Sequence, residues 1–249
     1  MITAVIPAKG ESETIGIIVN QVAKYVDEII VVTPADDLQT SQMLIGLPCL
    51  HVTSDIPGKG IALVKGVENS NGDILVFIDA DLSHDPSVIP RLVLPIQNGD
   101  ARHVCASRML GGSSELFYDL GQFVRLMGSH VITLLINHKY KSKLTDSQNG
   151  FRAMEKALFI EMNLRELHTT IEQEMTSQTL RLGNVMIEIP AHEFAREFGK
   201  SKIKVLRDGW RYVWVILDIA LRPKPKGWEK ADSQSIQDKY KERWFDEFI

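Results

Sequence analysis

Short apolar runs alternate with segments of helical periodicity over roughly the first hundred residues of the chain. Five of these runs have the length of strands: 3–7, 28–33, 49–53, 73–78 and 103–108. Between them apolar residues recur every three or four positions, as Ile15, Ile18 and Val22 do. Because the connections are short, the pattern predicts an α/β fold with a parallel or mostly parallel sheet. Ligands of such sheets bind beyond the carboxyl ends of the strands.

The pattern changes after Arg108. An amphipathic segment, a polar loop, two helices and a strand are predicted at 115–138, 139–154, 155–164, 170–182 and 185–190. The tail from about residue 229 is charged, which predicts a helix or partial disorder. We therefore expect an α/β domain over residues 1–205 and, over 206–249, a C-terminal amphipathic helical extension with a polar tail.

Composition limits the classes of function. The chain has 249 residues, 44% of them hydrophobic and 24% charged, which is typical of a globular protein. A net charge of −4 gives no global positive excess that would indicate nucleic acid as a partner. Cys49 and Cys105 lie far apart in apolar runs and predict buried free thiols. With no secretory signal and no apolar run of ~18–20 residues, the sequence predicts a cytoplasmic protein.

The fourth apolar run ends in an acidic turn, VFIDADLSHDP, which contains Asp79, Asp81 and Asp85. Two carboxylates at a strand end suit a hard cation, Mg²⁺ or Mn²⁺, because phosphates and water can fill its other positions. Such a cation would offset the repulsion between the acids and the charge on a diphosphate leaving group. The alternative interpretation is that Asp85 caps the helix after Pro86 and the other two acids are solvated.

Four ordered motifs carry a resemblance to a known family: AVIPAKGESETIG, GKGIALVKGVENSNGDILVFIDADLSHDP, ASRMLGG and TDSQNGFRAM. Together they resemble the family 2 glycosyltransferases of the GT-A fold, a Rossmann-like and mostly parallel sheet, over roughly residues 1–205. TDSQNGFRAM and EFAREFGKSKI are similar to the SGFRA and R-x-x-G-x-SK patterns of the dolichyl-phosphate mannose synthase branch. The chain departs from the family at VVTPADD, where members usually have Asp-Asp-Gly-Ser, and at Ser83, where relatives often have Gln.

The resemblance implies a role for each motif. It implies nucleotide-sugar contacts from Pro7, Ala8, Glu11, Asp36, Lys59, Asp79 and Arg152, with bracing of the local loop as the alternative for Arg152. It implies metal ligation by Asp79, Asp81 and Ser83, and contacts to an acceptor phosphate from Arg108, Arg196 and Lys202. Asp146 and Asp81 are the candidate catalytic residues, and His192 is expected to be structural.

The implied activity is an inverting, metal-dependent transfer of a sugar from a nucleoside-diphosphate sugar to a polyprenyl (dolichyl) phosphate. One alternative is a soluble or polymer hydroxyl acceptor, for which Asp146 would be the catalytic base. Others are a nucleotidyltransferase, although PAKGESE lacks the expected glycine-rich loop, and an inactive sugar-nucleotide-binding scaffold.

The apolar stretch GWRYVWVILDIALRPKPKGW has aromatic residues and basic flanks. These features suit an interfacial helix that gives peripheral contact with the cytoplasmic membrane face, and they suit a core or dimer-interface helix nearly equally. The nucleotide base, the sugar and the oligomeric state stay open.

Overall fold

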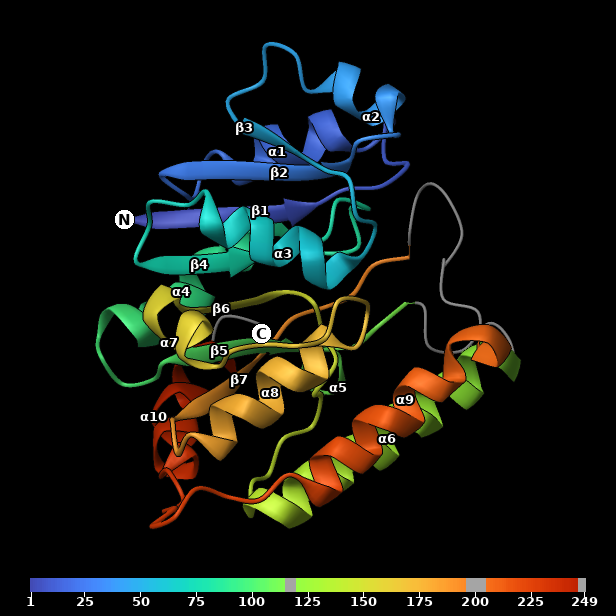
Figure 1. Ribbon diagram of the computed structural model, residues 1–249. Coiled ribbons are helices and arrows are strands. Elements are labelled where there is room, and N and C mark those ends of the chain that lie inside the picture. Colours follow the sequence, from blue (N-terminus) through green and yellow to red (C-terminus); the bar gives the residue numbers. More distant parts are fainter. Residues whose placement is uncertain (115–119, 196–204, 246–249) are drawn as a thin grey trace.

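The apolar runs form a seven-stranded sheet in the computed structural model, which describes residues 1–114, 120–195 and 205–245 (Figure 1). The strands are β1 (Ile2–Pro7), β2 (Glu28–Pro34), β3 (Leu50–Ser54), β4 (Ile74–Phe77), β5 (His103–Ser107), β6 (Arg152–Glu155) and β7 (Met186–Pro190). Their spatial order is β3-β2-β1-β4-β6-β5-β7. β6 runs antiparallel to both of its neighbours, and every other pair of adjacent strands is parallel. The predicted mostly parallel sheet is therefore confirmed.

Helices cover both faces of this sheet. One apolar cluster includes residues of α1 (Ile15–Val22), α4 (Ile89–Gln97) and α10 (Ser233–Phe245). A second cluster includes residues of α3 (Lys59–Glu68), α7 (Lys156–Glu161) and α8 (Ile171–Arg181). The short elements are α2 (Leu38–Met43), η1 (Pro86–Val88) and α5 (Arg108–Gly111). Two long helices, α6 (Leu120–Tyr140) and α9 (Val205–Leu221), lie side by side beyond the β7 side of the sheet (Figure 1).

The strands read as continuous apolar runs because both faces of the sheet are covered. In β1, Ala4 and Ile6 belong to one apolar cluster and Val5 to the other, and all three are buried. Successive side chains of a strand point to opposite faces, so each cluster receives alternate residues. The two cysteines are free thiols; Cys105 is buried as predicted and Cys49 is half-buried.

β6 lies at the end of a segment that the sequence predicts as a polar loop, and this prediction is wrong for its last residues. Its first residue, Arg152, pairs with Phe77 of β4 and Cys105 of β5 and has no exposed surface. Its guanidinium donates to the carbonyl oxygens of Asn149 and Glu172. A four-residue strand that begins with a buried arginine has no apolar alternation, so the pattern could not reveal it.

The charged tail contains α10, which packs against β7. The backbone N–H of Glu188 donates to Gln237 Oε1 (2.7 Å), and Gln237 Nε2 donates to the Glu188 carbonyl (2.6 Å). Gln237 therefore satisfies two backbone groups on an edge strand, as a neighbouring strand would. Tyr240 is buried in the same region and donates to Asp100 Oδ2 (2.5 Å). The division of the chain between residues 205 and 206 stays a prediction.

The described helices include none that is both long enough and apolar enough to cross a membrane.

Replacing Tyr240 with alanine tests whether α10 belongs to the core. Loss of a buried aromatic ring should lower the free energy of unfolding by about 3 kcal/mol or more. Tyr240→Phe keeps the ring and loses only the hydroxyl contacts, so we expect a loss of about 1 kcal/mol. Urea denaturation followed by circular dichroism measures both values. A Tyr240→Ala protein as stable as the wild type would show that α10 is not part of the folded core.

Candidate functional site

The carboxyl ends of the parallel strands lie along one edge of the sheet (Figure 1). β1 ends at Pro7, β2 at Pro34, β4 at Phe77 and β5 at Ser107. Because these strands are parallel, the residues that follow them share this edge.

Asp79 follows β4 and is joined to a half-buried lysine, Lys59. Lys59 Nζ lies 2.7 Å from Asp79 Oδ1 and 2.7 Å from Glu172 Oε1 on α8. Burial lowers the pKa of Lys59, but the two carboxylates together raise it by more than burial lowers it. The pKa therefore lies above its ordinary value. The lysine therefore stays charged and ties the start of α3 to the acidic turn and to α8.

Asp81 and Ser83 form the second part of the acidic turn, and both are buried. Asp81 Oδ1 accepts hydrogen bonds from the Ser83 amide (3.1 Å) and the Ser83 hydroxyl (2.6 Å). Leu82 between them has φ 62°, a left-handed conformation that is costly for a bulky residue and occurs most often at functional sites. Asp85 instead caps η1 by accepting from the amide and the hydroxyl of Ser87, so the predicted cap is confirmed.

The acidic turn supplies the oxygen ligands that a hard divalent cation prefers, so these residues fit Mg²⁺ or Mn²⁺. No group of three or more His, Cys, Asp or Glu side chains in the described ranges is arranged to hold a metal ion. An ion at Asp79 and Asp81 would therefore need further oxygen atoms from a ligand and from water.

A glycine brings the loop before β6 against this turn. A Cβ atom on Gly150 would lie 2.8 Å from Asp79 Oδ2 and 2.9 Å from Lys59 Nζ. Only glycine permits this close approach without moving the ion pair.

The first loop of the chain lies beside the end of β2. Three of the predicted ligands belong to it: Pro7, Ala8 and Glu11. Asp37 Oδ2 accepts from the Gly10 amide (2.5 Å), and Asp37 Oδ1 accepts from the Thr40 amide at the start of α2. Asp36, for which the resemblance implied a contact to the nucleotide sugar, is exposed. Asp37 is the residue that holds the first loop in place.

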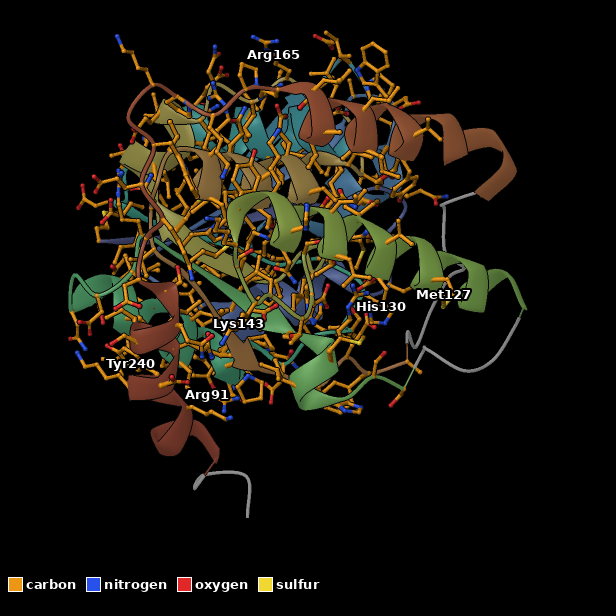
Figure 2. The ribbon with its side chains drawn as sticks, turned by 90° about the horizontal axis from the view of Figure 1, so that it is seen from below. Arg91, Met127, His130, Lys143, Arg165 and Tyr240 are labelled. Atoms are coloured by element: carbon orange, nitrogen blue, oxygen red, sulfur yellow. The ribbon has the colours of Figure 1, made fainter. Side chains whose placement is uncertain are left out.

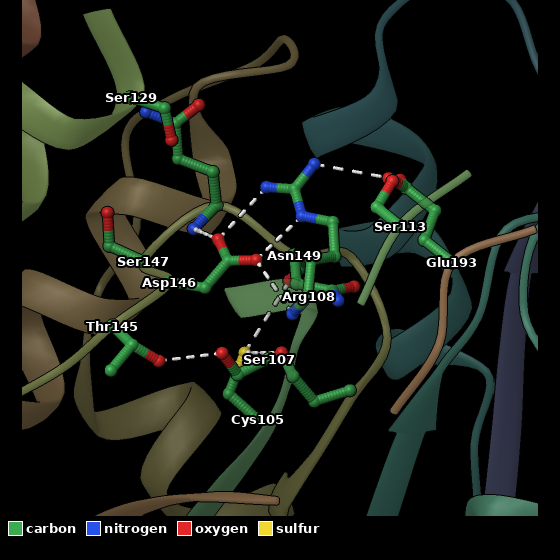
Figure 3. A network of polar contacts seen from close by, with 12 residues as sticks. Cys105, Ser107, Arg108, Ser113, Ser129, Thr145, Asp146, Ser147, Asn149 and Glu193 are labelled. Atoms are coloured by element: carbon green, nitrogen blue, oxygen red, sulfur yellow. Dashed lines mark hydrogen bonds and ion pairs between the residues drawn. The ribbon is translucent and has the colours of Figure 1, made fainter. Parts of the chain in front are cut away.

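Arg108, which is half-buried, and Asp146, which is buried, form an ion pair (Figure 3). Arg108, Asp79 and Asp81 all act electrostatically on His84 of the acidic turn, so the pair lies near that turn. Arg108 Nε lies 2.6 Å from Asp146 Oδ2, and Nη2 lies 2.9 Å from Oδ1, so the contact is bidentate. Burial raises the pKa of Asp146, but the Arg108 guanidinium and the hydrogen bonds from the Gln148 and Arg108 amides together outweigh it, and the pKa lies below its usual range. Arg108 Nη1 also lies 3.6 Å from Glu193 Oε1.

The remaining predicted residues fall into three groups. Arg152 braces the loop before β6 from inside the core and presents no surface to a ligand, which favours its alternative role. His192 has its ring nitrogens near Ser114 Oγ (2.8 Å) and the Gly111 carbonyl (3.2 Å), as a structural histidine would. Arg196 and Lys202 lie outside the described residues.

Sequence reasoning missed three carboxylates that contact the site: Glu172, Glu188 and Glu193. Glu172 sits in a helix and Glu193 in a loop, where acids are common. The one available signal was Glu188, an acid inside the apolar run VMIEIP.

The Arg108–Asp146 pair predicts a pH-dependent loss of stability. At pH 7, Asp146→Asn leaves the half-buried Arg108 guanidinium without its main partner and should lower the free energy of unfolding by about 3 kcal/mol, the low end for a broken buried pair. Because the pKa of Asp146 is lowered by folding, its contribution is complete above the unfolded value and disappears as the pH falls through the folded one. The difference between variant and wild type should therefore shrink in strong acid.

Urea denaturation across this pH range measures the loss. The double variant Arg108→Met/Asp146→Asn is the control and should recover much of it, since the guanidinium that Asp146→Asn leaves unpaired is then removed. If the free energy of unfolding of Asp146→Asn at pH 7 is within about 1 kcal/mol of the wild-type value, the pair contributes no more than an exposed ion pair does. That result would contradict a tightly coupled pair.

The family model for glycosyl transferase family 2 matches residues 3–162. The chain is 24% identical to a low-salt glycan biosynthesis hexosyltransferase of Haloferax volcanii, over 76% of this chain and 45% of that protein. It is 30% identical to the undecaprenyl-phosphate mannosyltransferase of Micrococcus luteus, over 63% of this chain and 65% of that protein. The chain thus spans less than two thirds of the length of these relatives.

Solved structures show the same fold. A glucosyl-3-phosphoglycerate synthase of Mycobacterium tuberculosis superposes with a TM-score of 0.71 at 22% identity, covering 88% of this chain and 79% of that one. This likeness confirms the predicted GT-A fold. Because the family model also matches more than half of the sequence, the chain belongs to glycosyl transferase family 2.

Proposed function

We propose that this chain transfers a sugar from a nucleoside-diphosphate sugar to a phosphate-bearing acceptor with inversion at the anomeric carbon. The observation that carries the proposal is the acidic turn of Asp79 and Asp81 at the strand ends, with Lys59 beside it and the Arg108–Asp146 pair next to it. A family 2 chain has its donor site at this edge by the general rule for open parallel sheets.

Asp79 and Asp81 would hold Mg²⁺ or Mn²⁺, and the Ser83 hydroxyl would orient Asp81. When bound, the ion neutralises charge on the departing diphosphate. Solved glucosyl-3-phosphoglycerate synthases contain Mn²⁺ with UDP-glucose and Mg²⁺ with UDP, which supports an oxygen-rich site of this kind.

The donor nucleotide would lie along the first loop, against Pro7, Ala8 and Glu11. Lys59 adds a fixed positive charge beside Asp79, where the diphosphate must approach the acids. Because Glu172 also holds this ammonium, it is already oriented before the substrate binds.

The acceptor would be a phosphate, and the state of Asp146 favours this choice. Asp146 is paired with Arg108 and has a lowered pKa, so it is a poor base for a hydroxyl group. A phosphate oxygen with a second pKa of about 6 attacks without such a base. Asp146 then orders the site and Arg108 attracts the acceptor phosphate.

A polyprenyl phosphate fits the surface near this site. On α6, Met127 and Leu134 are exposed, and on the neighbouring helix α9 so are Trp214 and Leu221 (Figure 2 shows Met127 on α6). Apolar residues on adjacent helices can contact lipid, and two relatives are named dolichol-phosphate and undecaprenyl-phosphate mannosyltransferase. Peripheral membrane contact through α6 and α9 is part of this proposal.

A soluble phosphorylated acceptor is the second candidate. The glucosyl-3-phosphoglycerate synthase of Mycolicibacterium paratuberculosis is 34% identical over 43% of this chain and 36% of its own length. For an acceptor of this type the nucleophile is a hydroxyl group and Asp146 becomes the base.

The acidic turn offers a matched test of metal and nucleotide binding. The wild type should show a higher melting temperature with UDP, or another nucleoside diphosphate, when Mn²⁺ is present. Asp79→Asn and Asp81→Asn should lose this Mn²⁺-dependent shift. Asp85→Asn is the control in the same turn: it removes a carboxylate charge but keeps the oxygen that caps η1, so it should keep the shift. A wild type that responds to no nucleotide would favour the inactive scaffold.

Incubation of the protein with radiolabelled nucleotide sugars, and with either membrane lipid extract or phosphoglycerate, distinguishes the lipid acceptor from the soluble one. We expect label in the organic phase, and Asp146→Asn should retain some of this activity because the phosphate needs no base. Label only in a water-soluble product, with Asp146→Asn inactive, would replace the lipid acceptor by the second candidate.

A further inference from the structure

A second buried carboxylate lies directly behind the Arg108–Asp146 pair. Glu188, in the middle of β7, is 3% exposed. Its Oε2 accepts from the amide (2.7 Å) and the hydroxyl (3.0 Å) of Thr145, and its Oε1 accepts from the amide of Asp146 (2.7 Å). One side chain therefore binds two consecutive backbone N–H groups of the segment that carries Asp146.

We propose that Glu188 is the positioning residue of the acceptor side: in its ionised form it holds the Thr145–Asp146 backbone, and through it the Asp146–Arg108 pair. Both oxygen atoms of Glu188 face donors. A protonated carboxyl could still donate to the Thr145 hydroxyl, which can accept, but it would hold the two backbone N–H groups only through weaker, neutral hydrogen bonds. The ionised form binds both amides through charge-assisted hydrogen bonds.

The charges and hydrogen bonds around Glu188 place the ionisation of its carboxyl group near neutral pH. Burial raises the pKa of Glu188 and the neighbouring Asp146 charge raises it further, while the hydrogen bonds of Thr145 and Asp146 lower it, with a result of about 7. Cys105 of β5 faces the same region, and burial raises its pKa to about 12, so it stays a neutral thiol through this range. Arg152 of β6 and Arg108 of α5 are the positive charges that act on Cys105 from this side.

Glu188 also lines a cavity of ≈ 150 Å³ on the side away from the acidic turn, between β7, α10 and the segment before β6. Its other titratable or charged lining residues are Tyr140, Lys143, Lys230, Asp238 and Lys241. A cavity of this size with charged and polar groups in its lining has room and partners for water, which would give the carboxyl a path for proton exchange that does not cross the proposed substrate site.

Glu174 provides a matched control within the same chain. It is a buried carboxylate whose pKa burial raises, and its Oε2 accepts from two consecutive amides, those of Arg165 and Glu166, at 2.8 Å each. Glu174 thus binds two consecutive amides of the 165–166 segment, as Glu188 binds those of the 145–146 segment, but its segment does not contain Asp146.

Hydrogen exchange of the Thr145 and Asp146 amides, corrected for the intrinsic effect of pH, tests the inference on the full chain. In the wild type their protection should fall about tenfold between pH 8 and pH 6, because one unit below a pKa of about 7 leaves about a tenth of the carboxyl ionised. In Glu188→Gln it should already be low at pH 8 and nearly independent of pH. Glu174→Gln should lower protection at 165–166 and leave 145–146 as in the wild type.

Wild-type protection at 145–146 in Glu188→Gln would overturn the proposal. If Glu188→Gln does not fold, the wild-type titration decides alone: protection at 145–146 that does not change between pH 6 and pH 8 overturns it equally.

A second test, the pH dependence of the acceptor KM, rests on the proposed function. The acceptor KM should rise as the pH falls through 7 in the wild type, and should be high and flat in Glu188→Gln, with the donor KM unchanged in both. An unchanged acceptor KM in Glu188→Gln would contradict the role of Glu188. If the wild type transfers no sugar to any acceptor, the proposed function fails, while the exchange experiment still decides whether Glu188 positions the loop.

Discussion

The site depends on placing several carboxylates at one edge of a sheet with little water to separate them. Like charges that are close together and desolvated repel strongly, so each needs a cation or an N–H group as a partner. Asp79 and Glu172 share the ammonium of Lys59, and Asp146 has the guanidinium of Arg108. Glu188 has backbone amides and a hydroxyl in place of a cation. In the proposed function this arrangement attracts a divalent cation to the acidic turn and an acceptor phosphate to Arg108.

Segments that do not contact ligands still decide the geometry of the site. β6 is inserted antiparallel between β4 and β5, and its buried Arg152 holds the loop that brings Gly150 against Asp79. On the other side, α10 presents Gln237 to the backbone of Glu188. The C-terminal helix therefore supports β7 at the residue that fixes the Asp146 segment, which links the end of the chain to the centre of the site.

Much of the fold followed from the sequence because the parallel strands are apolar and regularly spaced. The acidic turn was recognised for the same reason, since Asp79 and Asp81 directly follow such a strand. β6 and α10 were harder, because Arg152 and the polar side chains of α10 are used for internal hydrogen bonds that no periodicity records. The partners of the predicted residues, such as Glu188, come from distant segments, and only the folded chain brings them together. The roles proposed for the site residues stay predictions.

A crystal structure of the chain with Mn²⁺ and a nucleoside diphosphate tests the central claim most directly. The account predicts one ion with oxygen ligands from Asp79 or Asp81, at about 2.0–2.2 Å as expected for a small hard cation, and with the remaining ligands from the diphosphate and water. An ion bound elsewhere, with the acidic turn making no contact to the nucleotide, would contradict it.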